Sequence, residues 1–442
     1  MNTDDLVQSI YIGTFGAERY WRDNNLAVLP FLKDNEAENI IGTLDELQFV
    51  FCNNDILFTR HQLERIQIDY LNTIGYNFNN LYLYENDREQ KFSSENICKI
   101  LINHKQSNYF PSLKKNVEFA PYAIDEYSRQ FCDVYKINCE IPGFDVVRKV
   151  NSKHFSFEIL KSIYPIYNGE YIDSTDSLLI TGKKLLENAG SFLLKDIFGV
   201  SGNGNILIES ENRLNTIYNY LLRQELVGKY VQFIAEPLYK KDIDFSCQLD
   251  IFANGEIVYN SIQVMHNKGF AFSGIEAADQ NFYNHLEKSG YFNYIEKIVE
   301  TVYKEGYFGP LCIDSMQLLD SSIIPLIEIN ARKSMGLINT LFKKKHKGCS
   351  NTFLITYSLG IPSIVTYEMF LDTLRSHNIL FYPNKEYGIV PLTSKAFSIN
   401  KNNLSQTYRG RIYLGFIYDN ANTKNHLILE LEKVFSVLNI QS

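Results

Sequence analysis

Two short apolar segments late in the chain, residues 311–316 and 325–332, each carry one acid, and a polar stretch around Ser321 separates them. Such a pattern is typical of two strands joined by a hairpin turn. In an antiparallel pair centred on Ser321, facing residue numbers have a constant sum, which places Asp314 opposite Glu328. The sequence therefore predicts a β-hairpin in which two carboxylates face each other.

This pair of acids indicates a cation site. Like charges directly opposite in a ladder repel each other, and Asn330 lies on the same face as Glu328. Oxygen ligands of this kind suit Mg²⁺, with Mn²⁺ as the alternative. A single acid in a strand is most often just solvated, but the paired spacing, Asn330 and the following Arg332 favour the metal interpretation.

Size and composition exclude several classes of protein. A chain of 442 residues predicts roughly two to four domains or subdomains. Hydrophobic content of 45% and charged content of 21% are typical of a soluble globular protein. The net charge of -8 argues against binding to nucleic acid or to an anionic membrane. Seven cysteines without a CxxC pair, and no signal peptide or membrane span, predict a cytoplasmic protein with reduced thiols.

The first part of the chain alternates short apolar runs with helical stretches, which predicts an α/β domain with a partly parallel sheet. The expected strands are Ser9–Gly13, Leu47–Phe51 and Ile56–Thr59. Pro142-Gly143 marks a boundary. A second unit begins near Val150.

A glycine-rich stretch, residues 199–205, follows a strand that ends at Lys195. Glycine lets backbone N–H groups turn toward an anion, so the stretch can cradle a phosphate. It has neither the P-loop pattern nor the GxGxxG order, and a plain hairpin turn is about as good an interpretation. Lys195 could equally be a cap at the strand end, and Lys153 is in isolation an ordinary lysine at a helix start.

Further along, Glu236 follows an apolar strand and could connect two subdomains, while Asp244 begins the next strand. Each acid alone is more often structural. The stretch His266–Gly274 is a candidate for a mobile loop over the site, and Lys268 within it could reach a phosphate, although an exposed lysine is the simpler interpretation. Zinc motifs, a nucleophile elbow and a credible catalytic cysteine are missing from the sequence.

Taken in chain order, these residues resemble those of the ATP-grasp ligases. The resemblance implies that Lys153 and Lys195 bind ATP phosphates, with Lys195 also catalytic. It implies that a loop folds over those phosphates, with nucleotide-binding residues Gly199, Ser201, Gly202, Asn203, Gly204 and Asn205. Glu236, with Pro237 and Leu238, would meet the adenine.

By the same resemblance Asp244 would meet the ribose hydroxyls. The segment before it is about one residue longer than in D-alanine:D-alanine ligases, so Asp242 is its rival. Asp314, Glu328 and Asn330 would hold Mg²⁺. Arg332 would act in catalysis, facing the acyl phosphate or the substrate carboxylate.

The ends of the chain resemble the pheganomycin-type peptide ligases and their carrier-protein-loading relatives, through residues 13–21, 328–334 and 410–415. That resemblance implies an α/β architecture of three parts. They are a pre-ATP-grasp domain at residues 1–148, an ATP-grasp domain at 149–342 with a subdomain hinge near 235–238, and a C-terminal α/β domain at 343–442.

The expected activity is that of an ATP-dependent carboxylate-amine ligase, which forms an amide or peptide bond through an acyl phosphate, in specialised metabolism such as antibiotic biosynthesis. One alternative is a carboxylate-thiol ligase that loads an amino acid onto a carrier protein. Another is a nucleotide-binding protein that has lost catalysis. The expected substrates are a small carboxylate and an amine, and the residues do not identify either one. A homodimer is also possible from the sequence.

Overall fold

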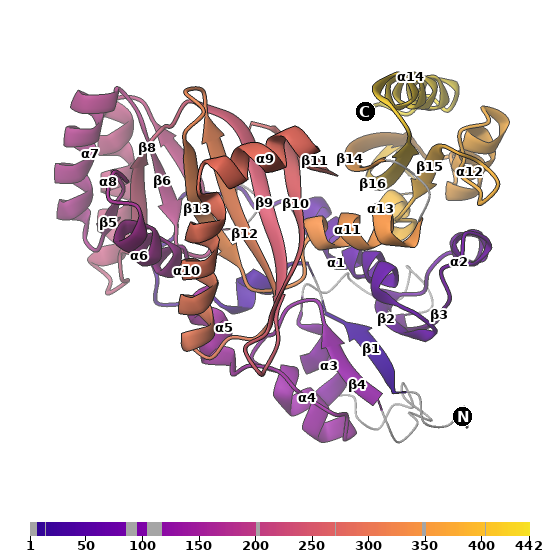
Figure 1. Cartoon of the computed structure of the whole chain (residues 1–442), viewed down its shortest axis with the longest axis horizontal. Helices are drawn as coiled ribbons and strands as arrows, with labels where there is room; N and C mark the ends of the chain where they lie inside the picture. Colours follow the sequence, from indigo (N-terminus) through magenta and orange to yellow (C-terminus); the bar gives the residue numbers. More distant parts are fainter. Residues whose placement is uncertain are drawn as a thin grey trace.

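Three β-sheets organise the computed structural model, which describes residues 7–13, 15–84, 95–103, 117–199, 204–269, 271–346, 351–402 and 404–442. Figure 1 shows the small sheet on the left, the large sheet in the centre and right, and the N-terminal sheet below. Among the described residues, no helix is both long and apolar enough to cross a membrane.

The N-terminal sheet is parallel, with strand order β3-β2-β1-β4. Its strands are β1 Gln8–Ile12, β2 Asp55–His61, β3 Phe78–Tyr84 and β4 Val117–Pro121. The helices of this part are α1 Asn35–Thr43, α2 Arg65–Thr73, α3 Ile97–Asn103 and α4 Ser128–Tyr135, with the 3₁₀ helices η1 Ala17–Tyr20 and η2 Leu44–Phe51. The parallel α/β prediction is thus confirmed.

The predicted strand Leu47–Phe51 is wrong, because these residues belong to η2. Every residue from Leu44 to Val50 is buried. A continuous apolar run fits a buried helix turn as well as a buried strand, and periodicity alone does not separate the two.

The small sheet is antiparallel, with strand order β5-β8-β6-β7. Its strands are β5 Glu170–Ile172, β6 Phe192–Asp196, β7 Asn205–Ile208 and β8 Phe233–Pro237. Helices α7 Thr175–Ala189 and α8 Glu211–Glu225 pack together and share a core with this sheet, in which Phe192 and Phe233 are fully buried. Helices α5 Phe144–Val150 and α6 Lys153–Ile163 come before this unit, and α6 lies between it and the large sheet (Figure 1).

The large sheet has eight strands in the order β13-β12-β9-β10-β11-β14-β16-β15. The strands are β9 Lys241–Ile251, β10 Ile257–Lys268, β11 Ala271–Ala277, β12 Gly309–Leu318, β13 Ile323–Asn330, β14 Asn351–Pro362, β15 Gly388–Pro391 and β16 Thr407–Tyr418. Its helices are α9 Gln280–Lys288, α10 Tyr291–Lys304, α11 Met335–Lys345, α12 Tyr367–Ser376, α13 Lys395–Ser398 and α14 Ala421–Val437. The sheet therefore contains strands from both sides of the boundary predicted at residue 343.

The predicted mobile loop His266–Gly274 is instead mostly a β-hairpin. Residues 266–268 belong to β10, and residues 271–274 to β11. The pairing of His266 with Gly274 and of Lys268 with Ala271 closes the ladder almost to its tip. Polar and glycine residues mislead here because both are common in exposed hairpin ends as well as in loops.

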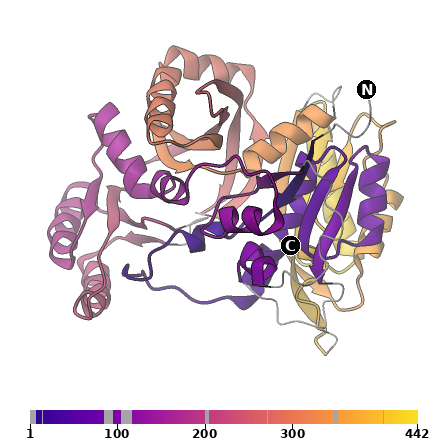
Figure 2. The same ribbon diagram turned by 90° about the horizontal axis from the view of Figure 1, so that it is seen from below.

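A segment after η1 joins the N-terminal unit to the small sheet. Leu26 forms a parallel bridge with Tyr230, and Val28 exchanges two hydrogen bonds with the Gln224 side chain. Ala27 and Leu29 are buried in the core of the small sheet unit. Figure 2 shows this indigo segment reaching across to that unit.

Candidate active site

The two acids predicted to face each other do so. Strands β12 and β13 pair antiparallel, with Asp314 opposite Glu328. Ser321 in the turn has φ 67°, the left-handed conformation that closes a tight hairpin. Helix α6 covers the hairpin, and Ile329 N–H donates to Ser156 Oγ at 3.1 Å. The predicted pairing of Asp314 with Glu328 is therefore confirmed, although a register shift between Asp314 and Met316 means that pairs nearer the turn, such as Met316 with Ile324, do not keep the same sum.

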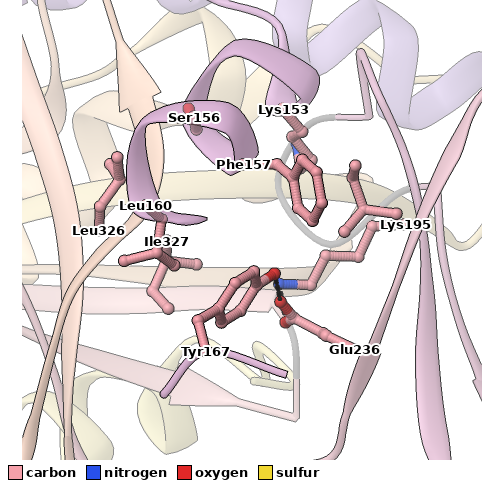
Figure 3. A pocket seen from close by; sticks show the side chains of 10 residues that line it. Lys153, Ser156, Phe157, Leu160, Tyr167, Lys195, Glu236, Leu326 and Ile327 are labelled. Carbon is pink, nitrogen blue, oxygen red and sulfur yellow. Dashed lines mark hydrogen bonds and ion pairs between the residues drawn. The ribbon is translucent and has the colours of Figure 1, made fainter. Parts of the chain in front are cut away.

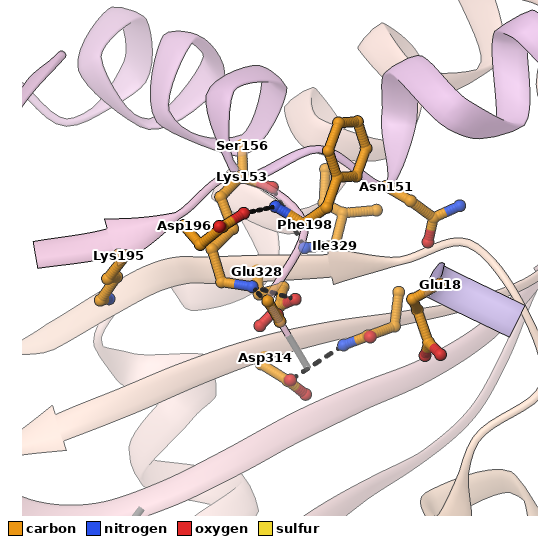
Figure 4. Close-up of polar contacts among 12 residues, drawn as sticks. Glu18, Asn151, Lys153, Ser156, Lys195, Asp196, Phe198, Asp314, Glu328 and Ile329 are labelled. Carbon is orange, nitrogen blue, oxygen red and sulfur yellow. Dashed lines mark hydrogen bonds and ion pairs between the residues drawn. The ribbon is translucent and has the colours of Figure 1, made fainter. Parts of the chain in front are cut away.

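The electrostatics of this pair favour a bound cation. Burial, followed by the charge of Glu328, raises the pKa of Asp314 to about 7. Lys153 Nζ contacts Glu328 Oε1 at 2.7 Å, and Asn330 Nδ2 donates to Asp314 Oδ2 at 2.9 Å (Figure 4). One lysine offsets one carboxylate, so the second negative charge is left for a cation to balance.

The donor set fits a magnesium ion. Among the described residues there is no group of three or more His, Cys, Asp or Glu side chains that could hold a metal ion. Two carboxylates and the Asn330 carboxamide are nevertheless the hard oxygen donors that Mg²⁺ takes, since it usually keeps water and phosphate oxygens as its other ligands. Asp314, Glu328 and Asn330 are the residues that would hold it.

Lys153 connects the acid pair to the glycine-rich stretch. It is the first residue of α6, whose N-cap Ser152 accepts a hydrogen bond from Phe155 N–H. Its own N–H donates to Ile197 O at 2.9 Å, and its Nζ donates to Gly199 O. The ammonium group of Lys153 therefore lies between Glu328 and the start of this stretch.

The glycine-rich stretch lies in part outside the described residues, including the predicted Ser201, Gly202 and Asn203. Gly204 has φ +89°, and a Cβ there would lie 3.0 Å from Gly199 Cα. Only glycine allows this close turn between β6 and β7. Asn205 begins β7 opposite Lys195, and its buried Oδ1 accepts no hydrogen bond from a described residue.

A small pocket lies between α6, the small sheet and β13 (Figure 3). Half of the ten residues that line it are apolar, namely Phe157, Leu160, Ile234, Leu326 and Ile327. Lys195 and Glu236 form an ion pair in it, and both side chains are almost fully buried. Apolar side chains beside polar groups are typical of a small-molecule site.

Tyr167 is a pocket residue that sequence reasoning missed. Its hydroxyl donates to Glu236 Oε2 at 2.8 Å. Burial, and then the charge of Glu236, raises the pKa of Tyr167 above its ordinary value. The tyrosine lies in the short connection between α6 and β5, among many scattered aromatic residues, so no local pattern distinguishes it.

The remaining predicted nucleotide contacts surround this core. Asp244 accepts from Lys241 Nζ at 2.5 Å and from Asn267 Nδ2 at 2.7 Å, and its charge reaches Asp314. Its rival Asp242 accepts from Gln317 Nε2 at 3.1 Å. Pro237 ends β8, Leu238 beyond it is exposed, and Lys268 is exposed near the tip of the β10–β11 hairpin.

Arg332 lies beside the acid pair, as predicted, but its contacts include an N-terminal residue. Its Nη2 donates to Asn330 Oδ1 at 2.9 Å and lies 2.7 Å from Glu18 Oε1. Its Nη1 lies 3.3 Å from Tyr122 Oη. Burial lowers the pKa of Arg332, but the charge of Glu18 opposes it and the pKa stays above its ordinary value. The sequence analysis did not predict Glu18 or Tyr122 as site residues, although residue 18 lies within the stretch 13–21 that carries the family resemblance.

Known proteins resemble the chain in sequence and in structure. No family model matches the sequence. The chain is 26% identical over 311 residues to a [butirosin acyl-carrier protein]--L-glutamate ligase from Niallia circulans, covering 69% of this chain and 67% of that protein.

Two solved structures share most of the architecture. N5-carboxyaminoimidazole synthetase from Staphylococcus aureus, complexed with ADP, aligns with a TM-score of 0.51 at 12% identity, over 97% of this chain and 99% of that one. Biotin carboxylase from Campylobacter jejuni aligns with a TM-score of 0.55 at 12% identity, over 99% of this chain and 92% of that one. This is the ATP-grasp fold. The predicted fold class is therefore confirmed.

Proposed function

We propose that this protein is an ATP- and Mg²⁺-dependent ligase that joins the carboxylate of an amino acid or peptide to an amine. The observation that carries the proposal is the facing pair Asp314 and Glu328, joined through Lys153 to the glycine-rich stretch. The similarity to a carrier-protein glutamate ligase supports it, as does a solved structure of the same fold that was crystallised with ADP.

In this proposal the nucleotide occupies the pocket of Figure 3. The base lies between Phe157 on α6 and the apolar residues of β13, near the Lys195–Glu236 pair. Lys153 and Lys195 reach toward the phosphates. We assign the ribose to Asp244 rather than Asp242, because β9 pairs Asp244 with Met316, two residues from Asp314, whereas Asp242 contacts Gln317.

The chemistry needs no protein nucleophile. The carboxylate oxygen attacks the γ-phosphorus of ATP, the bond to ADP breaks, and an acyl phosphate forms. The amine then attacks the acyl carbon, phosphate leaves, and the nitrogen loses its proton. The cationic side chains Lys153, Lys195 and Arg332 offset the charge that builds up on the transferred group, where positioning and electrostatics dominate catalysis. Bound Mg²⁺ would add to that charge neutralisation.

The test measures the nucleotide product. Full-length protein is mixed with ATP, Mg²⁺, an amine and candidate amino acids, and ADP and phosphate are expected to form only when the acid is present. The Glu328→Gln variant should abolish this turnover, whereas Glu300→Gln, an exposed acid on α10, should retain it. AMP and pyrophosphate as products would contradict the acyl phosphate.

A carrier-protein thiol is the second candidate acceptor, because the relative from Niallia circulans is named for an acyl-carrier protein. Intact-mass analysis of a carrier protein encoded beside this gene separates the two acceptors. A carrier that gains the mass of an acyl group supports the thiol, and an unmodified carrier with a free amide product supports the amine. We place either reaction in the cytoplasm, because a reducing compartment keeps thiols free. The free cysteines among the described residues are Cys52, Cys98, Cys132, Cys139, Cys247 and Cys312.

A further inference from the structure

Glu18 is a buried acid at the active site that the proposed phosphoryl chemistry does not use. It lies on η1 of the N-terminal unit, and its residue is only 6% exposed. Its carboxylate lies 2.7 Å from Arg332 Nη2, yet neither of its oxygens accepts a well-aligned hydrogen bond from a described residue. Arg332 Nε is buried without a described acceptor as well. Both partners therefore keep hydrogen-bonding capacity.

The position of Glu18 connects it to the reacting end of the site. Arg332 donates to Asn330, and Asn330 donates to Asp314, at 2.9 Å in each case. Figure 4 shows Glu18 approaching the acid pair from the N-terminal side, across from Lys153 and Glu328. A substrate carboxylate held at Arg332 therefore has Glu18 as its immediate neighbour.

A second buried acid of the N-terminal unit shows what a structural carboxylate looks like in this protein. Glu46, 2% exposed, accepts hydrogen bonds from the backbone N–H groups of Ser394, Lys395 and Ala396 and from Ser394 Oγ. Burying a charge is costly unless hydrogen bonds compensate it. Glu46 has that compensation within the protein. Within the described part of the chain Glu18 contacts a single guanidinium, that of Arg332, which also contacts Asn330 and Tyr122.

We infer that Glu18 is a specificity residue that binds the ammonium group of an α-amino acid whose carboxylate lies at Arg332. A guanidinium beside a carboxylate is complementary to an amino-acid zwitterion, in which the carboxylate and the ammonium are separated by one carbon. The ammonium supplies N–H donors that the Glu18 oxygens lack, and the carboxylate accepts from Arg332. The inference rests on the proposed function and narrows its acid substrate to one with a free α-amino group.

The experiment compares acids with and without that group. Wild-type protein with ATP, Mg²⁺ and hydroxylamine as the amine is offered the common L-amino acids and simple carboxylic acids, and ADP is measured. The best amino acid is then compared with its desamino analogue, in which hydrogen replaces the ammonium. We expect kcat/KM to favour the amino acid by about 100-fold or more, because an unmatched buried polar group rejects the analogue.

Variants distinguish recognition from positioning of Arg332. Glu18→Gln should raise KM for the amino acid by about 100-fold and leave KM for ATP and for the desamino analogue nearly unchanged, so that the preference collapses. Glu18→Asp should restore part of the preference. Arg19→Gln, which changes the exposed neighbour on the same turn, should behave as wild type.

Several outcomes overturn the inference. If Glu18→Gln lowers kcat equally for the amino acid and its analogue, Glu18 only positions Arg332, although the ligase activity itself stands. If Glu18→Gln does not fold, the wild-type preference decides, and equal use of both acids refutes a role for the ammonium. Turnover only with acids that lack an amino group refutes the inference alone. ADP formation with no acid at all refutes the proposed function as well.

Discussion

Two partly buried carboxylates of the same large sheet are in opposite electrostatic states. Glu276 on β11 contacts His266 Nε2 and accepts from Tyr418 and Lys424, and although burial alone would raise its pKa, these partners lower it to about 2. Asp314 on β12 faces another acid, and burial and that charge raise its pKa to about 7. A carboxylate with several hydrogen-bond donors stabilises the folded state, whereas a carboxylate that faces another acid can bind a cation.

The largest expected effect follows from changing Asp314, the acid that faces another carboxylate. Asp314→Asn keeps the shape of the side chain but removes its charge, so acid-dependent ADP formation should fall by about 100- to 1000-fold in kcat. The thermal midpoint without Mg²⁺ should stay or rise, because repulsion with Glu328 is removed. Unchanged turnover in a steady-state assay would mean that Asp314 is not a metal ligand.

Glu276, the acid that accepts hydrogen bonds from Tyr418 and Lys424, should show the reverse behaviour. Glu276→Gln loses the charge that Lys424 and Tyr418 bind, and should lower the free energy of unfolding by about 1.5 kcal/mol. Its kcat should stay within about twofold of wild type, because the residue stabilises packing rather than a transition state. Urea denaturation and the ADP assay measure the two quantities. A large kcat loss with normal stability would remove the distinction between the acids.

The pH dependence of stability should have opposite signs at the two acids. The folded pKa of Glu276 lies below its ordinary value, so its stabilisation is present above about pH 4.5 and is lost as pH falls toward 2. The folded pKa of Asp314 lies above its ordinary value, so its favourable contribution is present below about pH 4 and is lost as pH rises through 7. Thermal melting in chelator, with each variant subtracted from wild type, tests both signs. Two slopes of the same sign would contradict the comparison.

The smallest effect concerns a hydrogen bond within the pocket. Tyr167→Phe removes the donor to Glu236 but keeps the ring, so ATP binding should weaken by about 1 kcal/mol, or roughly fivefold in KM. The kcat at saturating ATP should not change. The exposed Tyr303→Phe on α10 is the matched control. If KM for ATP is unaffected, Glu236 keeps its orientation through Lys195 alone.

Local pattern predicted elements well where turns and periodicity agree. The strands β1, β2 and β6 lie close to their expected positions. Leu47–Phe51 was misassigned because a run that is buried on all sides shows no periodicity that separates a helix from a strand. His266–Gly274 was misassigned because exposed polar residues at a hairpin tip look like a loop in the sequence.

The candidate site was also predicted from the sequence only in part. Lys153, Asp314, Glu328 and Asn330 are brought together as expected, and Lys195 and Glu236 meet each other rather than standing apart. The mutual contact of Lys195 and Glu236 was not foreseen, because it depends on a diagonal pairing between β6 and β8.

By itself the sequence determined the hairpin, since its two apolar runs are close along the chain and a polar turn joins them. A register shift between Asp314 and Met316 then sets the final pairing of Asp314 with Glu328. Tertiary structure alone decided the rest. Lys153 reaches Glu328 across 175 positions, and Glu18 reaches Arg332 from another unit. Such contacts arise only when separate sheets pack together, and no local periodicity records which side chains that packing will join.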